Sequence, residues 1–209
     1  MLYKNTIEAS SLELLKKLQS DKVFQNFHLA GGTSLALQTG HRKSVDLDLF
    51  SLTDFNVNFL LEHLENVYNF KMNYSATNTL SGSIHTTKID FISHKYPLVD
   101  SVFKEENVRL YSVKDIAAMK LNAIAGNGTR IKDFIDVFFI LKTYSIEEVL
   151  SFYKIKYNSR NTFHILKSLV YFEDVDLSNW PEMILRENIS FEEIKHLISS
   201  RVKQYSQKF

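Results

Sequence analysis

The stretch that most constrains the fold of this chain is HLAGGTSLALQTGHRKSVDLDLF, residues 28–50. Two adjacent glycines, Gly31 and Gly32, stand near its start, although the 209-residue chain contains only 6 glycines. The pair follows a short apolar segment that reads as a strand and precedes residues 33–39, which read as a short helix ended by Gly40. The sequence therefore predicts a glycine turn that leads from a strand into a helix.

The end of the same stretch, SVDLDLF, alternates apolar and acidic residues. This alternation predicts a β-strand with Val45, Leu47 and Leu49 on one face and Asp46 and Asp48 on the other. Two carboxylates held together repel each other unless a cation or a proton lies between them. A hard divalent ion such as Mg²⁺ suits such oxygen ligands, so the strand predicts a metal site.

The glycine turn predicts a second kind of ligand. Glycines between a strand and a helix allow a phosphate to approach the backbone N–H groups, and the N-terminus of a helix favours an anion. One end of the stretch therefore suits phosphates, and the other end suits a metal ion. Together they predict binding of a metal-bound nucleoside triphosphate.

A third carboxylate is expected from the segment TKIDFIS, residues 87–93. If Ile89 and Phe91 face the core, Asp90 faces outward together with Lys88. Should this strand lie beside the D-x-D strand, three carboxylates would bind two metal ions, one for the attacking hydroxyl and one for the triphosphate. Transfer of a phosphoryl group in line needs mainly positioning and neutralisation of charge.

The rest of the chain divides into a mixed half and a helical half. Strands are expected at 69–76, 80–87 and 88–93, and helices at 8–19, 55–66, 113–125, 129–143 and 160–172, with further helices opened by Ser145 and Ser190. Asp54 is expected to cap the helix over 55–66. After Pro97 the pattern is helical. The predicted domains are therefore 1–111, an α+β core, and 112–209, a helical region.

Composition excludes several classes of protein. The chain is 44% hydrophobic, enough for one sizeable core, and its formal net charge of +1 excludes a coat that binds nucleic acid by charge alone. It has no cysteine, which excludes disulfides and thiolate metal sites. Neither a signal peptide nor a membrane-spanning apolar run is recognisable. The expectation is a soluble, cytoplasmic protein.

In these motifs the chain resembles the polymerase-β-type nucleotidyltransferases, and within them the AbiEii/AbiGii toxin family, which is related to the MenT toxins. The family pattern is a Gly-Gly pair, a spacer and D-x-D; here 13 residues separate Gly32 from Asp46. The second family motif is matched by KID at 88–90. The later motifs are matched by Lys120 and by a run that contains Arg130, Lys132, Asp133 and Asp136.

The resemblance implies a mixed-sheet nucleotidyltransferase core with flanking helices and a C-terminal helical part. It implies that Mg²⁺ or Mn²⁺ binds to Asp46, Asp48 and Asp90. It further implies triphosphate contacts from the turn at Gly31 and Gly32, from Thr33 or Ser34 and from Lys120, with Asp133 and Asp136 either orienting Lys120 or lying beside the nucleotide. Arg42, just before the D-x-D strand, is expected to touch phosphates; the alternative is an ordinary polar loop.

Three functions remain open from the sequence. The first is a toxin that transfers NMP from an NTP to an RNA acceptor, by resemblance a tRNA, and that has a cognate antitoxin. The second is the same chemistry on a small molecule or a protein hydroxyl. The third is a non-catalytic protein that binds a nucleotide or a partner. The segment 152–172, with aromatics and Lys154, Lys156, Arg160 and Lys167, is either an RNA-binding surface or a packed helical pair with a solvated basic face.

Overall fold

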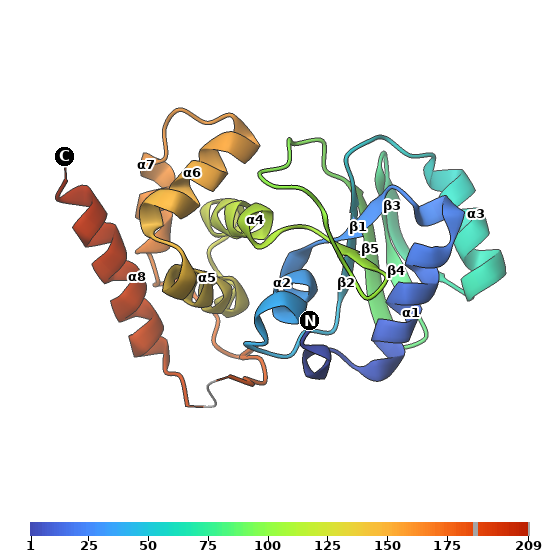
Figure 1. The fold of residues 1–209 in the computed structure, drawn as a ribbon, viewed down its shortest axis with the longest axis horizontal. Coiled ribbons are helices and arrows are strands. Elements are labelled where there is room, and N and C mark those ends of the chain that lie inside the picture. The colour runs from blue at the N-terminus through green and yellow to red at the C-terminus, as the bar shows by residue number, and fades with distance from the viewer. Residues whose placement is uncertain (186–187, 209) are drawn as a thin grey trace. The chain divides into compact units, whose positions relative to one another are not determined.

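The chain forms two compact units, one made of Met1–Tyr96 and Ser101–Tyr111 and the other of Pro97–Asp100 and Ser112–Phe209. The structure, a computed structural model, describes residues 1–185 and 188–208. The first unit contains a mixed sheet and helices, and the named elements of the second unit are helices (Figure 1). The predicted α+β fold, with a C-terminal helical part, is confirmed.

The first unit holds seven strands and three α-helices among its described residues. Its elements are η1 (Lys4–Thr6), α1 (Ala9–Ser20), η2 (Lys22–Phe24), β1 (Phe27–Leu29), α2 (Gly31–Thr39), β2 (Leu47–Ser51), α3 (Val57–Tyr68), β3 (Lys71–Ala76), β4 (Thr79–Ile84), β5 (Thr87–Ser93), β6 (Phe103–Glu105) and β7 (Val108–Leu110). The strands form one sheet in the order β3-β4-β5-β2-β1-β7-β6. Two pairs, β2 with β5 and β1 with β7, are parallel, and the other neighbours are antiparallel.

The core of the first unit lies on one face of this sheet. Alternate residues of β1, β2 and β5 are apolar and buried there, and they pack against the apolar sides of α1 and α3. Figure 1 shows α1 and α3 on one side of the sheet and α2 on the other. Because side chains alternate along a strand, the polar residues of β2 and β5 are left on the face where α2 begins.

Two expectations for the first unit were wrong. The region after Pro97 is not helical at once, because Val108 and Leu110 are buried and place β7 beside β1. The helix over 55–66 begins at Val57, and its cap is Asn56, whose side chain accepts the N–H of Phe59 at 3.1 Å. Asp54 was the predicted cap, but its carboxylate instead accepts from the side chain of Asn78 at 2.6 Å.

The second unit is a set of helices around α4. Its elements are α4 (Val113–Gly126), α5 (Ile131–Thr143), α6 (Ile146–Tyr157), α7 (Phe163–Leu169) and α8 (Phe191–Ser206). Helix α4 contacts α5, α6 and α7, and α8 contacts the same three helices. The starts of α4, α6 and α8 are capped by Ser112, Ser145 and Ser190, as predicted. The helix expected over 160–172 is shorter and covers only α7.

A buried ion pair lies in the interior of the second unit. The ammonium of Lys156 lies 2.8 Å from Asp115 Oδ1, and both side chains are 0% exposed. Asp115 also accepts the N–H groups of Val99 at 2.9 Å and Asp100 at 3.2 Å. The carboxylate thereby ties the segment Pro97–Asp100 to α4 and α6. Lys156, which the sequence placed among basic residues of a surface, is therefore part of the interior.

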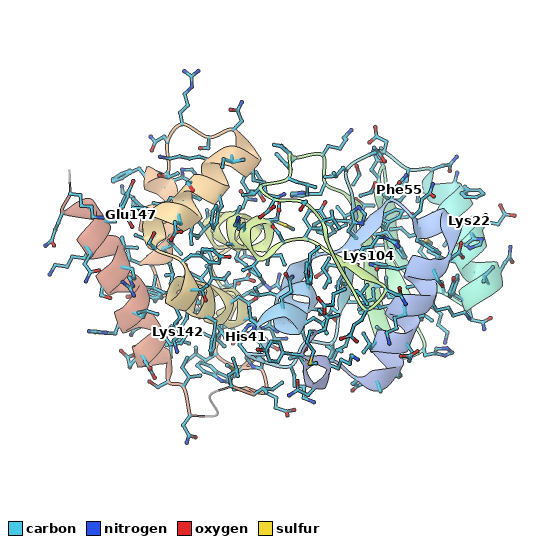
Figure 2. All side chains as sticks on the ribbon, in the orientation of Figure 1. Lys22, His41, Phe55, Lys104, Lys142 and Glu147 are labelled. Carbon is cyan, nitrogen blue, oxygen red and sulfur yellow. The ribbon has the colours of Figure 1, made fainter. Side chains whose placement is uncertain are left out.

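Charged side chains on the surface of this unit also contact neighbouring residues. Lys142 of α5 and Glu147 of α6 are labelled in Figure 2. The ammonium of Lys142 lies 4.3 Å from the ring centroid of Phe138, a cation–π distance. Glu147 pairs with Lys208 near the end of α8. In the part of the chain that the structure describes, no helix has the length and apolar character required to cross a membrane.

We predict that Asp115→Ala lowers the free energy of unfolding by about 3–5 kcal/mol, because it leaves the buried ammonium of Lys156 without its carboxylate. Urea unfolding followed by the fluorescence of the single tryptophan, which lies in this unit, measures the change. The double variant Asp115→Leu/Lys156→Met should lose less than Asp115→Ala, since it removes both charges. An unfolding free energy of Asp115→Ala equal to that of the wild type would contradict the assignment.

Candidate active site

The acidic residues of β2 and β5 lie side by side. The two strands are parallel, and Asp48 is the direct partner of Asp90 in their register. The flanking residues Leu47, Leu49 and Ile89 are 0% exposed on the core face. Both carboxylates therefore leave the opposite face of adjacent strands, which run about 4.8 Å apart. The expected placement of the Asp90 strand beside the D-x-D strand is confirmed.

Asp46 reaches the same region from outside the strand. Strand β2 begins at Leu47, so Asp46 precedes it, and Val45 is 52% exposed instead of lying on the core face as predicted. The reason is that the preceding loop is held by α2 and not by the sheet: the hydroxyl of Thr33 hydrogen-bonds to the carbonyl oxygen of Asp46. The position of Asp46 is thus set by the helix.

All three carboxylates act on one cation, Lys88. Its ammonium lies 3.0 Å from Asp90 Oδ2. The hydrogen bond to Asp90 raises the pKa of Lys88 above its ordinary value, and the negative charges of Asp90, Asp46 and Asp48 raise this pKa further. Lys88 faces outward, as expected. Its electrostatic interaction with Asp46, Asp48 and Asp90 was not predicted.

Ser81 is a further residue of the site that the sequence analysis missed. It lies on β4, opposite Asp90 in the antiparallel register, and its hydroxyl donates to Asp90 Oδ1. The signal was available in principle, because the segment LSGSIHTTKIDFIS reads as a hairpin. Pairing its two arms around the turn places Ser81 across from Asp90.

The two glycines make room for two side chains of the chain itself. Gly31 has a φ of +63°, and a Cβ at this position would lie 1.8 Å from Asp48 Oδ2. A Cβ at Gly32 would lie 2.4 Å from Arg42 Nη2. The pair therefore brings a carboxylate and a guanidinium against the first turn of α2. Helix α2 has no capping side chain at Ala30, so the carboxylate of Asp48 is the anion at its N-terminus.

The hydroxyls predicted to touch phosphates have partners inside the protein. Thr33 is 1% exposed and lies 2.8 Å from the hydroxyl of Ser44. Ser34 is 0% exposed, and its hydroxyl donates to the carbonyl oxygen of Tyr111 at 3.3 Å. Arg42 is 3% exposed and donates to the carbonyl oxygen of Lys43 at 2.9 Å. These bonds fix α2 and its following loop, and the phosphate contacts of these residues stay predictions.

The later motifs form a buried cluster in the second unit. Lys120 of α4 lies 2.6 Å from Asp133 Oδ1 and 2.7 Å from Asp136 Oδ2, both on α5. All three residues are buried. Asp133 Oδ2 accepts no hydrogen bond, and the guanidinium of Arg130 approaches it only to 3.8 Å. The two aspartates therefore hold the ammonium of Lys120 in place, whereas its contact with a triphosphate stays a prediction.

The acidic set suits a divalent cation by its chemistry. Asp46, Asp48 and Asp90 offer carboxylate oxygens, the ligands that Mg²⁺ and Mn²⁺ prefer. Within residues 1–185 and 188–208, no group of three or more Asp, Glu or His side chains is gathered closely enough to hold a metal ion. In this arrangement, with the ammonium of Lys88 3.0 Å from Asp90 Oδ2, the three residues offer suitable ligand atoms but are not gathered into a metal site, so the expected close approach of all three carboxylates is not seen.

We predict that Gly31→Ala lowers the free energy of unfolding by about 1–2 kcal/mol, because a left-handed backbone conformation is unfavourable for alanine, and that it displaces the carboxylate of Asp48. Urea titration followed by circular dichroism measures the change. The matched control is Gly126→Ala, where a Cβ meets nothing within 4 Å. Equal stability of Gly31→Ala and the control would contradict the role of Gly31.

Comparison with solved structures identifies proteins of similar fold. In solved structures, the chain is similar to a proposed nucleotidyltransferase from H. pylori (TM-score 0.56, 19% identity, 96% of each chain covered) and to JHP933 from Helicobacter pylori (TM-score 0.55, 19% identity, 97% of this chain and 94% of that one). At this identity the likeness concerns the fold.

Sequence comparison gives the family. An uncharacterized protein from Aquifex aeolicus (strain VF5) is 31% identical over 199 residues, which cover 92% of this chain and 94% of that protein. The model of the family described as nucleotidyl transferase AbiEii toxin, type IV TA system, matches residues 13–73 and 67–197. The chain is therefore a nucleotidyltransferase and belongs to the AbiEii family of type IV toxin–antitoxin toxins.

Proposed function

We propose that this protein transfers a nucleoside monophosphate from an NTP to an RNA acceptor, a tRNA, in the presence of Mg²⁺ or Mn²⁺, and that a cognate antitoxin restrains it. The observation that carries the proposal is the in-register pairing of Asp48 with Asp90, with both carboxylates and Asp46 acting on Lys88. A nucleotidyl transfer needs a concentrated negative site of this kind, because the triphosphate must be neutralised through a cation.

The reaction forms one bond and breaks one bond. The oxygen of the acceptor hydroxyl attacks the α-phosphorus, the bond from this phosphorus to the β-phosphate oxygen breaks, and pyrophosphate leaves; the hydroxyl proton passes to water. A divalent cation supplies neutralisation of the phosphates and a more acidic acceptor hydroxyl. The residues that would hold it are Asp46, Asp48 and Asp90.

The remaining residues of the site position the nucleotide. The backbone N–H groups that follow Gly31 and Gly32 lie at the positive end of α2 and suit a phosphate, with Arg42 over Gly32 as a neighbouring cation. Lys120 of the second unit, held by Asp133 and Asp136, is expected to contact the triphosphate on its resemblance to the family motif alone. An RNA site must be a local patch, since the net charge is only +1, and binding should weaken as salt rises.

We predict that Asp48→Asn lowers nucleotidyl transfer by about 100-fold or more while the fold is kept, because it removes a negative charge that would hold the cation that neutralises the phosphates. The assay incubates the protein with each labelled NTP, Mg²⁺ and total RNA and searches for labelled species, with circular dichroism as the check on folding. Asp54→Asn is the matched control, since Asp54 is exposed and pairs with Lys95 away from the acidic set. Near-normal transfer by Asp48→Asn would overturn the site.

We also predict that expression without the antitoxin slows growth, and that the double variant Asp46→Ala/Asp48→Ala does not. The reason is that growth arrest, in this proposal, follows from modification of RNA. Growth curves after induction measure the effect. Equal toxicity of the wild type and the double variant would separate toxicity from transfer. Absence of toxicity, together with transfer to a small hydroxylated compound, would favour the small-molecule alternative.

A further inference from the structure

The turn Gly126-Asn127-Gly128 has no role in the site described above. Gly126 is the last residue of α4, its φ is not positive, and a Cβ there would meet nothing within 4 Å. Neither backbone conformation nor a neighbour in this chain therefore requires glycine. Glycine lowers the stability of a helix relative to alanine, and its lack of a side chain allows close approach to the backbone. The space beside Gly126 is open, so a ligand could approach the backbone at this position.

A hollow of about 480 Å³ lies over this turn, within the second unit. It is formed by the end of α4 and by the end of α7 with the residues that follow. Its walls include Gly126, Asn127, Lys167, Ser168, Tyr171 and Asp174. We name it the α4–α7 pocket. Its volume lies in the usual range for small-ligand sites, about 300–1,000 Å³.

The walls of the α4–α7 pocket combine an aromatic ring with hydrogen-bond acceptors. Tyr171 is 52% exposed. The charge of the nearby Asp174, and a hydrogen bond to it, raise the pKa of the Tyr171 hydroxyl, so this hydroxyl is engaged while the ring stays accessible. The C-terminal end of a helix presents backbone carbonyl groups and partial negative charge. Together with the carboxylate of Asp174, these groups select a ligand that donates N–H groups.

One cation stands beside these acceptors. Lys167 is exposed, and its ammonium lies 4.6 Å from the ring centroid of Phe163, itself 60% exposed. Because Lys156 is buried in its ion pair, Lys167 belongs to the smaller set of basic residues in segment 152–172 that solvent reaches. A stacking ring, acceptors for an amino group and a single cation correspond to the base and the phosphate of one nucleotide.

We propose that the α4–α7 pocket binds one unpaired base of the RNA acceptor that carries an exocyclic amino group. The base stacks on Tyr171, its exocyclic amino group donates to the acceptors at the end of α4 or to Asp174, and its phosphate lies at Lys167. Adenine, cytosine and guanine carry an exocyclic amino group, whereas uracil carries none. The inference rests on the proposed function insofar as the ligand is the acceptor RNA.

The test is direct binding of short, fluorescently labelled oligo(A), oligo(C) and oligo(U), followed by anisotropy. Wild type should bind oligo(A) and oligo(C) more tightly than oligo(U). Tyr171→Ala should weaken oligo(A) binding about 5- to 150-fold, the equivalent of one stacked base. Gly126→Leu should cause a similar loss, because its side chain enters open space and fills the pocket without disturbing the core. Circular dichroism of each variant confirms folding.

The matched control is Tyr74→Ala, since Tyr74 is 59% exposed on β3 in the first unit; its oligo(A) binding should equal that of the wild type. The proposal is overturned if Tyr171→Ala and Gly126→Leu bind oligo(A) like the wild type, if wild type binds none of the oligonucleotides, or if oligo(U) binds as tightly as oligo(A).

A parallel transfer assay separates this inference from the proposed function. Transfer to RNA by wild type, with an unchanged KM for RNA in both pocket variants, would retain the function and overturn the pocket. Absence of transfer to any RNA, together with loss of oligo(A) binding in both pocket variants, would overturn the function and support the pocket.

Discussion

The parallel pairing of β2 with β5 is the constraint on which the candidate active site depends. It sets Asp48 beside Asp90, and it also buries Leu47, Leu49 and Ile89 completely on the other face. A slip of one residue would move the apolar side chains into solvent and the carboxylates into the core. The hydrophobic face therefore enforces the register, and the carboxylates are held together as a consequence of core packing.

Helix α2 completes the site from the side of the loop. Its first glycine leaves room for the Asp48 carboxylate, its second for the Arg42 guanidinium, and its Thr33 hydroxyl holds the carbonyl of Asp46. A helix N-terminus attracts an anion, and in this structure the anion is Asp48. The turn that the sequence assigned to a phosphate is therefore already lined by a carboxylate of the chain itself.

The sequence predicted best the features that hydrophobic periodicity and capping residues determine, namely the faces of strands and the starts of helices. Strict alternation foretold that β5 faces Asp90 outward, and three serine caps foretold the starts of α4, α6 and α8. The short hairpin of β6 and β7 was missed, because three-residue strands offer too few positions for a pattern. Asp54 was predicted as the cap of α3, but its carboxylate accepts from Asn78, 24 residues away in the chain, and Asn56 is the cap; the local pattern does not show this contact.

For the site, the sequence could place residues on faces but could not assign their partners. Strand alternation turned Lys88 outward with Asp90, yet the arrival of Asp46 from the loop depends on a hydrogen bond to Thr33 that no local pattern encodes. The predicted alternation included Val45, but the strand begins only at Leu47. Val45 belongs to the preceding loop and is exposed. Lys156 illustrates the opposite error, because its carboxylate partner lies 41 residues earlier in the chain.

The two buried lysines of the second unit form ion pairs in different surroundings. Asp115 is the partner of Lys156, and both of its carboxylate oxygens accept hydrogen bonds within the unit. The cluster of Lys120 is unlike it, since Asp133 Oδ2 is buried and accepts no hydrogen bond. The guanidinium of Arg130 lies 3.8 Å from this oxygen and its side chain is 65% exposed, so the charge that compensates Asp133 extends toward solvent, whereas the pair of Lys156 and Asp115 is fully buried.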